Sequence, residues 1–401
     1  MLFAASFFFI WEILEFSIEY LSFLLKPIPS NFAYRFHTYQ HLSENIHFLL
    51  PFANFDGVHY LQIAHDGYRP AEHAFFPFYP LLIHYLAPIF AQSYFLAGLC
   101  IANISFLGGL YFFKKYLELL GKKPQAILWT FLFLLSFPTS FFFSTVYTEG
   151  LFFLFLTAAL YFAQKKQYVK VFIAALLASL TKLIGIFLII PLFMILLTDV
   201  NKLPLKQKKI KENIQILSHF FYTNKKTILI SLSPVYGLTI YMAYLFYTTG
   251  DFLAFYHEQA GFHNERTVSH LVFLPQVYYR YLKIFLTASH DITYFIAVIE
   301  FVFFTLFLIV LLYDFWRLWK NTEQPARLSL LGLTIFSLIN LILPSLTGTL
   351  TSTPRYDLLS LSFFIRIAEI KNLWTRISLF TIFILFHVVL LSLFVQGHFV
   401  G

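Results

Sequence analysis

The stretch QSYFLAGLCIANISFLGGLYFFKK, residues 92–115, decides the class of fold. It has no charged residue until the two lysines at its end. A helix of about 20 apolar residues is long enough to cross the hydrocarbon core of a bilayer. Further apolar runs lie at about 1–25, 125–143, 147–163, 171–197, 228–249, 291–313, 328–344, 357–370 and 377–397. We therefore predict an all-α polytopic membrane protein with about 10–11 transmembrane helices.

The composition excludes other classes of protein. Of the 401 residues, 59% are hydrophobic and 12% are charged, whereas an ordinary soluble domain has about 25% charged residues. So few charges cannot cover a soluble particle, which excludes a soluble enzyme and a disordered chain. The apolar residues come in unbroken runs, not in alternation, which excludes a membrane β-barrel. The single cysteine, Cys100, allows no intrachain disulfide.

The basic residues predict an orientation. Most of the 28 Lys and Arg residues lie in short loops between apolar runs, and such loops are typically cytoplasmic. The long stretches 26–91 and 250–290 then become outer loops that carry short amphipathic helices, and 199–226 becomes a basic cytoplasmic linker. We interpret 1–401 as one transmembrane domain of the cell (inner) membrane, with 1–25 as a retained helix. The net charge of +8 is explained by this pattern without a nucleic-acid partner.

The run 171–197 does not fit a single crossing. Lysine-rich segments flank it on both sides, and both should be cytoplasmic. We expect two short helices that enter the membrane and return, with Thr181, Lys182 and Gly185 near the turn, surrounded by protein or by a water-filled cavity. The alternative is that Lys182 extends from a helix end to the interface.

The first outer loop, 26–91, holds the richest group of chemically active side chains. If 55–65 form a helix, then Asp56, His59, Tyr60 and Ile63 share one face. A helix N-terminus stabilises Asp56 as the anion, and a confined carboxylate suits general-base catalysis. The alternative is that Asp56 only caps the helix.

Other candidates lie near further predicted helix ends. Glu149 begins an apolar run, where it could cap a helix or bind a sugar hydroxyl. Asp251 and Gln259 lie among aromatic residues, a pattern typical of carbohydrate or lipid-headgroup contacts and equally of an interfacial amphipathic helix. Arg355 is placed to bind a phosphate. The alternatives for Arg355 are pairing with Asp357 or with lipid phosphates.

Histidine is concentrated in the two predicted outer loops. No pair of histidines has the spacing of metal ligands with an acidic residue beside it. The sequence therefore predicts no particular metal site and no certain cofactor, and it leaves a divalent cation open.

Motifs in a fixed order lie between residues 54 and 356: Asp56-Gly-Val-His-Tyr-Leu-Gln-Ile-Ala-His-Asp-Gly-Tyr68 with Phe75-Phe-Pro-Phe-Tyr-Pro-Leu-Leu82, then Tyr147-Thr-Glu149, Leu180-Thr-Lys-Leu-Ile-Gly185, Gly250-Asp-Phe-Leu-Ala-Phe255 and Pro354-Arg-Tyr356. Together they resemble the PIG-V-like family, the second GPI mannosyltransferases, which are GT-C integral membrane glycosyltransferases. The first motif is fairly specific, and the order of the motifs strengthens the resemblance.

The sequence departs from the family pattern at three places. The family has Arg-Trp-Asp where this chain has Asn54-Phe-Asp56, arginine where it has Lys182, and proline where it has Phe252. The chain is also short and rich in lysine. The resemblance therefore implies a prokaryotic member that acts on an acceptor other than a GPI lipid.

The resemblance implies a GT-C glycosyltransferase fold and the transfer of a hexose. The donor is a polyprenyl-phosphate sugar, typically mannose, and the acceptor is lipid-linked or a glycan on the outer, periplasmic face. Asp56 acts as base in one inverting displacement, and Arg355 and Lys182 stabilise the donor phosphate. The residues expected to contact the substrates are His59, Tyr60, Asp66, Tyr79, Glu149, Asp251, Gln259 and Tyr356.

Two other classes of function compete with the enzyme. A transporter or flippase of lipid-linked sugars would share an aromatic, charged outer cavity, but it should also carry charges along a path between both faces. The predicted ionisable residues lie on one face, which favours the enzyme. A non-enzymatic subunit of a larger transferase is the second rival, and the presence of Asp56 argues against it.

Overall fold

A computed structural model describes residues 2–25, 44–196, 222–258, 271–320 and 326–400. Within these ranges every regular element is a helix. The first half contains α1 (Leu2–Leu25), η2 (Glu44–Ala53), α2 (Asp56–Asp66), α3 (Phe78–Leu86), η3 (Ala87–Phe90), α4 (Tyr94–Leu119), α5 (Pro124–Ser136), η4 (Ser140–Phe143), α6 (Glu149–Gln164), α7 (Tyr168–Thr181), η5 (Leu183–Leu188) and α8 (Ile189–Leu196). The second half contains α10 (Lys225–Ser231), α11 (Ser233–Thr249), α12 (Ala254–His257), α13 (Leu274–Thr287), α14 (Ile292–Lys320), α15 (Arg327–Ser345), α16 (Thr353–Asp357), α17 (Leu361–Ala368) and α18 (Leu373–Val395).

Four described helices are long and apolar enough to cross a membrane: α4, α14, α15 and α18. A fifth span is obtained if α10 and α11, which meet at 51°, are counted together. The prediction of an all-α, multi-pass membrane protein is therefore confirmed. Among the described residues, fewer than the expected 10–11 transmembrane helices are long enough to cross a membrane by themselves, because several predicted runs form helices of only 10–17 residues.

The run 357–370 illustrates the difference between an apolar run and a membrane crossing. It is not one crossing but the end of α16, a break at Ser360 and the eight-residue helix α17. Nearly every side chain of α17 is buried in the protein. A short apolar helix is stable at membrane depth when protein covers its ends and sides, so hydrophobicity alone cannot separate it from a true span.

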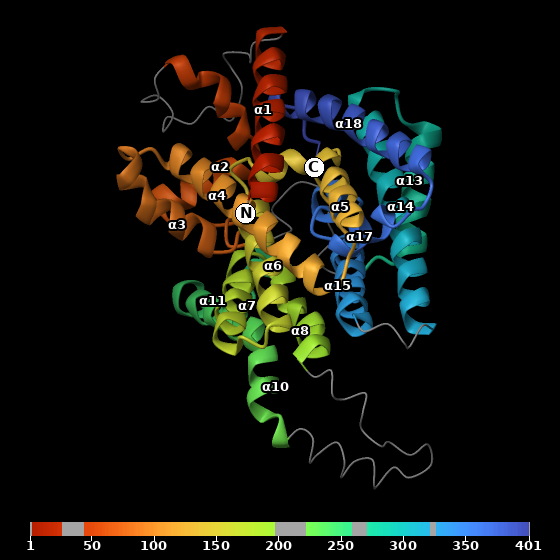
Figure 1. Cartoon of the computed structure of the whole chain (residues 1–401). Coiled ribbons are helices and arrows are strands. Elements are labelled where there is room, and N and C mark those ends of the chain that lie inside the picture. Colours follow the sequence, from red (N-terminus) through yellow and green to blue (C-terminus); the bar gives the residue numbers. More distant parts are fainter. Residues whose placement is uncertain (1, 26–43, 197–221, 259–270, 321–325, 401) are drawn as a thin grey trace.

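Small residues bring the central helices close together. α4 lies against α6, where a Cβ on Gly109 would come within 2.4 Å of the Phe153 ring. α11 lies against α7, where a Cβ on Gly237 would come within 2.5 Å of the Leu176 carbonyl oxygen. Membrane helices associate through close packing, because lipid provides little hydrophobic driving force between them. The helices α6, α7 and α8 thereby form the middle of the bundle (Figure 1).

The predicted reversal within 171–197 is present. The helix α7 ends at Thr181, Lys182 is extended, and η5 and α8 follow. A Cβ on Gly185 would lie 2.7 Å from the backbone of Ala178, so the chain folds back tightly at this glycine. Both α7 and α8 contact α10 (Figure 1), which places the two open ends of this pair near each other.

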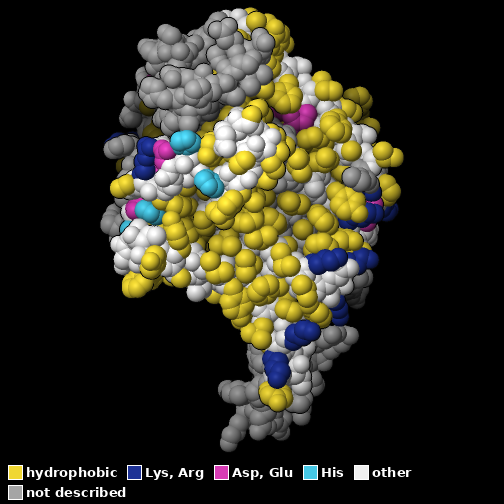
Figure 2. Space-filling model, turned by 90° about the vertical axis from the view of Figure 1, so that its left-hand side faces the viewer, with side chains coloured by type: hydrophobic (Ala, Val, Ile, Leu, Met, Phe, Trp, Pro, Cys, Tyr) yellow, Lys and Arg dark blue, Asp and Glu magenta, His cyan; other side chains and the backbone are white. Residues whose placement is uncertain are grey.

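The surface is divided by the type of side chain. On the face shown in Figure 2, a broad hydrophobic area covers the middle of the molecule, several lysine and arginine side chains lie toward the narrow lower end, and histidines lie at the upper left together with acidic and further basic side chains. Exposed apolar area of this extent is typical of a lipid-facing surface. The division agrees with the basic loops and histidine-rich loops seen in the sequence.

Candidate functional site

One cavity of about 380 Å³ gathers residues from segments that are far apart in the sequence. Its lining includes Asp56, Tyr147 to Glu149, Thr181 to Ile184, and Arg355 with Tyr356. Tyr256, just after the Gly250 motif, also lines it. Each motif quoted from the sequence thus reaches this cavity directly or through a neighbouring residue. Pockets of this size, with an apolar wall and a few converging polar groups, are the usual form of ligand sites.

Asp56 is the first residue of α2, and its carboxylate points to Arg355. The Asp56 Oδ2 lies 2.6 Å from the Arg355 Nη1. The residue at the cap position is Phe55, with φ 58°, and it makes no side-chain capping bond. The alternative that Asp56 serves only as the N-cap is therefore wrong. A non-glycine residue at positive φ is strained, and here that strain sits directly beside the carboxylate.

Arg355 lies in α16 and is almost fully buried. Its guanidinium carbon is 5.3 Å from the ring centroids of Tyr147 and Tyr356 and 5.5 Å from that of Phe142. Burial lowers the pKa of Arg355, but the charge of Asp56 and the neighbouring Tyr356 and Glu149 raise it by more, so the pKa stays well above its ordinary value. This arginine is therefore a permanent cation.

The expected alternative pairing of Arg355 with Asp357 is absent. Asp357 is fully buried, and neither of its carboxyl oxygens has a hydrogen-bond partner. The Arg355 Nε also has no hydrogen-bond acceptor. A buried, unsatisfied guanidinium N–H costs free energy, and an anionic ligand in the cavity would satisfy it.

Glu149 and Lys182 form the second charged pair of the cavity. The Lys182 Nζ donates to the Glu149 Oε1 at 2.5 Å, and the same oxygen lies 3.7 Å from the Arg355 Nε. The Glu149 side chain is 1% exposed. Glu149 is the first residue of α6 and makes no ordinary cap, because its predecessor Thr148 holds the cap position. The helix break at Lys182 is what directs its ammonium group here.

Buried hydrogen bonds hold these elements in place. The Tyr147 hydroxyl donates to the Asn54 carbonyl oxygen at 2.7 Å, and the Asn54 amide donates to the Phe394 carbonyl oxygen at 2.9 Å. The Thr139 hydroxyl donates to the Pro354 carbonyl oxygen at 2.7 Å. These bonds fix the residues that precede Asp56 and Arg355, so both charged side chains leave a rigid frame.

The cavity contains two cations and two carboxylates, whose formal charges cancel. They lie among aromatic rings, where the effective dielectric constant is low and electrostatic interactions are strong. Asp56 is the most accessible of the four, with 28% of its side chain exposed. Arg355, Glu149 and Lys182 lie behind it at 7%, 1% and 18%. The arrangement can bind an anionic group between the cations while leaving one carboxylate open to a second ligand.

The other predicted site residues divide into three groups. Tyr60 and Tyr356 line the cavity, and the Tyr60 hydroxyl lies 3.5 Å from the Thr148 Oγ1. His59 and Tyr79 lie behind its wall. The His59 ring stacks on Phe75 at 5.0 Å, and the fully buried Tyr79 hydroxyl donates to the Gly98 carbonyl oxygen at 2.9 Å.

Asp66 and Asp251 lie elsewhere, on the surface. The Asp66 carboxylate is bound by His65 and Arg69, and Asp66 lines a separate cavity of about 540 Å³. The Asp251 Oδ2 lies 2.6 Å from the His257 Nδ1. The structure therefore places these two aspartates outside the cavity that Asp56 lines, and their expected contact with the substrates stays a prediction. Gln259 lies outside the described residues.

Two groups of buried polar residues were not found from the sequence. Asn340 lines the cavity and donates to the Tyr356 carbonyl oxygen at 2.6 Å. In α1, Glu12, Glu15 and Glu19 are buried along one face. Their spacing of three and four residues within an apolar helix is the signal that could have revealed them, because carboxylates in such helices normally face the protein interior.

The described residues contain no group of three His, Cys, Asp or Glu side chains arranged to hold a metal ion. Comparisons with models of known protein families, with curated proteins and with solved structures found no match. The fold of the described residues is that of a multi-pass, all-α membrane protein, and one of its cavities brings four charged side chains together.

Proposed function

We propose that the protein is a membrane glycosyltransferase of the GT-C type. It transfers a hexose, with mannose the leading candidate, from a polyprenyl-phosphate donor to a lipid-linked or glycan acceptor at the outer face. The observation that carries the proposal is the convergence of the motifs on one cavity, where Asp56, Arg355, Glu149 and Lys182 form one chain of ion pairs. The family resemblance supplies the chemistry, and the cavity supplies residues suited to it.

In the proposed reaction, the acceptor hydroxyl attacks the anomeric carbon of the donor sugar. Asp56 takes the hydroxyl proton as the new C–O bond forms. The bond between the anomeric carbon and the phosphate oxygen breaks, and the lipid phosphate leaves with the electron pair. Arg355 and Lys182 stabilise its charge, so that no general acid is required at the leaving group. A single displacement of this kind inverts the anomeric configuration.

Both cations of the cavity have carboxylate partners, and these partners limit how the donor phosphate can bind. The Arg355 guanidinium has several N–H groups, and its Nε–H can donate to a phosphate oxygen while Nη1 stays with Asp56. The Lys182 ammonium has three donors and is held by Glu149. Glu149 is therefore proposed to orient Lys182. The Tyr356 ring, whose centroid lies 5.3 Å from the Lys182 Nζ, is proposed to restrict the ammonium group further.

The test is sugar transfer by the purified full-length protein in detergent. It is supplied with radiolabelled polyprenyl-phosphate mannose and a lipid extract as acceptor pool. Asp56→Asn keeps the shape of the side chain and removes its basicity, so transfer should fall by about 10²–10⁴-fold. The matched control is Asp66→Asn, which alters an aspartate of the same helix outside the cavity and should leave transfer unchanged.

Each outcome of this test has a definite meaning. Loss of transfer in the Asp56 variant alone, with an unchanged melting temperature, supports the base assignment and the mannosyl donor. Equal transfer by Asp56→Asn and the wild type would refute Asp56 as base. An absence of transfer by the wild type with mannosyl, glucosyl and galactosyl donors would refute the transferase proposal.

A transporter or flippase of lipid-linked sugars is the second candidate, and the buried acids of α1 favour it. The Glu15 Oε1 lies 2.8 Å from the His387 Nε2 of α18, and both side chains are fully buried. Neither carboxyl oxygen of Glu19 has a hydrogen-bond partner. Ionisable residues at membrane depth often mark a path for ions or protons. The sequence did not predict such a path.

The two candidates are separated by a flipping assay in proteoliposomes. A fluorescent polyprenyl-phosphate sugar is incorporated, and its accessibility to an impermeant quencher is followed over time. A transporter would accelerate exchange between leaflets, and Glu19→Gln would slow it. The transferase proposal expects exchange at the rate of protein-free liposomes.

A further inference from the structure

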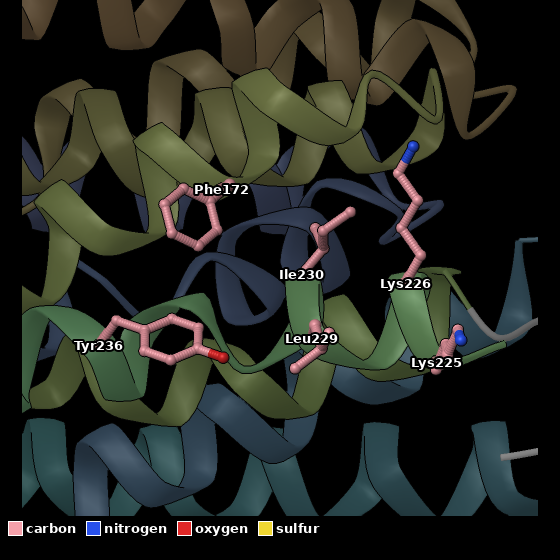
Figure 3. Close-up of a pocket in the computed structure, with 6 residues that line it drawn as sticks. All are labelled: Phe172, Lys225, Lys226, Leu229, Ile230 and Tyr236. Carbon is pink, nitrogen blue, oxygen red and sulfur yellow. The ribbon is translucent and has the colours of Figure 1, made fainter. Parts of the chain in front are cut away.

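A further hollow, of about 420 Å³, shares no lining residue with the charged cavity (Figure 3). It is lined by Phe172 of α7, by Lys225, Lys226, Leu229 and Ile230 of α10, and by Tyr236 of α11. Its volume is within the range of about 300–1,000 Å³ found for ligand sites. None of these residues takes part in the proposed glycosyl transfer.

The bend between α10 and α11 forms this hollow. The two helices meet at 51°, and Pro234 lies in the first turn of α11. Proline lacks the N–H that would continue the hydrogen bonds of α10, so the helix axis changes direction there. Phe172 of α7 faces the inside of the bend, with its ring 5.8 Å from that of Tyr236.

The lining of the hollow changes from apolar to basic along its length. Figure 3 shows Phe172 and Tyr236 at one end, Leu229 and Ile230 between them and the lysines, and the two lysines at the other end. Leu229, in the middle of the lining, is 53% exposed. An exposed apolar surface that ends in cations is complementary to an amphiphile with an anionic head.

The charge state of the two lysines supports this reading. Some lysines in the other described basic segments have carboxylate partners. Lys114 and Lys115 bind Glu118, and Lys122 binds Glu369. No described carboxylate lies within ion-pair distance of Lys225 or Lys226, and the contact made by Lys225 is with the exposed Tyr222 ring at 5.4 Å. Two neighbouring cations that no described carboxylate neutralises favour the binding of an anion beside them.

We propose that this hollow binds one anionic glycerophospholipid, with its phosphate at the basic end of the hollow, near Lys225 and Lys226, and an acyl chain along Phe172, Leu229 and Tyr236. The bound lipid joins α7, α10 and α11, and so stabilises the bend. Because α7 ends at Thr181, next to Lys182, the lipid holds the helix that positions one cation of the charged cavity. The proposal does not depend on the glycosyl transfer.

The test uses the full-length protein, delipidated in a neutral detergent and then supplied with phosphatidylglycerol or phosphatidylcholine. Native mass spectrometry counts the retained lipids, and thermal unfolding measures the stabilisation. The double variant Lys225→Gln, Lys226→Gln should weaken binding of phosphatidylglycerol roughly thirtyfold, since each lysine near an anionic lipid contributes about fivefold. The variant Lys225→Arg, Lys226→Arg keeps the charge and should retain the lipid.

The matched control is Lys165→Gln, Lys166→Gln. These lysines are also adjacent and exposed, but they line none of the described hollows. Retention of phosphatidylglycerol by the control and its loss in the Lys225, Lys226 variant would support the proposal. Equal binding of phosphatidylcholine, equal loss in both glutamine variants, or the same lysine-dependent stabilisation by inorganic phosphate alone would overturn it.

Discussion

Two ion pairs in this molecule have the same length and different surroundings. The Asp56 Oδ2 lies 2.6 Å from the Arg355 Nη1, and the Asp251 Oδ2 lies 2.6 Å from the His257 Nδ1. The arginine is 7% exposed and lies among aromatic rings, whereas the Asp251 and His257 side chains are 40% and 56% exposed. Water screens the second pair and is largely kept from the first. Distance alone therefore does not identify a functional pair, but burial and convergence with other charges do.

The largest difference between the buried and the exposed charges should be seen on replacing arginine. Arg355→Lys keeps the charge but loses the planar set of donors that can hold Asp56 and a phosphate at once. We expect sugar transfer to fall by about 10²–10³-fold, as for loss of one preorganised donor to a developing anion. The measurement is kcat/KM for the polyprenyl-phosphate sugar.

Arg69→Lys is the matched control, because Arg69 binds the exposed Asp66 in the same helix–loop region. It should leave kcat/KM unchanged. Equal losses in the two variants would show that the arginines act through the general fold and not through the cavity.

The second prediction concerns stability. Glu149→Gln removes the partner of Lys182 from a position that is 1% exposed, and breaking a buried pair from one side costs about 3–5 kcal/mol. We expect a clear fall in melting temperature in detergent. The double variant Glu149→Gln, Lys182→Met removes the uncompensated cation and should recover most of the lost stability, although not the transfer activity.

The exposed counterpart of this pair is Glu118, which is 36% exposed and binds Lys114 and Lys115. Glu118→Gln should change the melting temperature far less, because solvent screens such pairs. If Glu118→Gln were as destabilising as Glu149→Gln, burial would not be the property that separates the two regions.

The third prediction tests the turn that brings Lys182 into the cavity. In Gly185→Ala, the new Cβ would lie 2.7 Å from backbone atoms of Ala178, which cannot move aside cheaply. Overpacking of this kind costs about 1–3 kcal/mol, and a displaced Lys182 should also raise KM for the donor. Gly108→Ala is the control, because its Cβ would meet only the flexible end of Leu154, at 3.0 Å. It should leave KM unchanged.

The sequence predicted the class of fold and the residues that face each other across the cavity. Uncharged runs indicate which segments avoid water. The motifs contain Asp56, Glu149, Lys182 and Arg355, and these four residues line one cavity. The reversal at Lys182 was also predicted, because lysines on both sides of one run are incompatible with a single crossing. These features depend on composition and on local charge.

What the sequence could not predict depends on burial by distant parts of the chain. A run such as 357–370 is equally apolar whether lipid or protein surrounds it, and here protein does. The aspartates Asp66 and Asp251 lie in or near family motifs, but neighbouring helices leave them at the surface. Conversely, the spacing of the glutamates of α1 is that of one helix face, but the spacing alone does not show that His387 of α18 lies beside Glu15.

The smallest effects are expected at these two exposed aspartates. Hydrogen bonding to His65, helped by the charge of Arg69, lowers the pKa of Asp66, and hydrogen bonding to His257 lowers the pKa of Asp251. A carboxyl group with a lowered pKa stabilises the folded state above its ordinary pKa of about 4, and this contribution is lost as the pH falls through the folded-state value. At neutral pH, Asp66→Asn and Asp251→Asn should each lower the melting temperature only slightly, and this difference from the wild type should vanish in the acid range. Transfer activity should be that of the wild type. A large loss of transfer in Asp251→Asn, with the melting temperature retained, would mean that Asp251 moves to the cavity during the reaction. Exposure of a carboxylate would then not exclude a catalytic role.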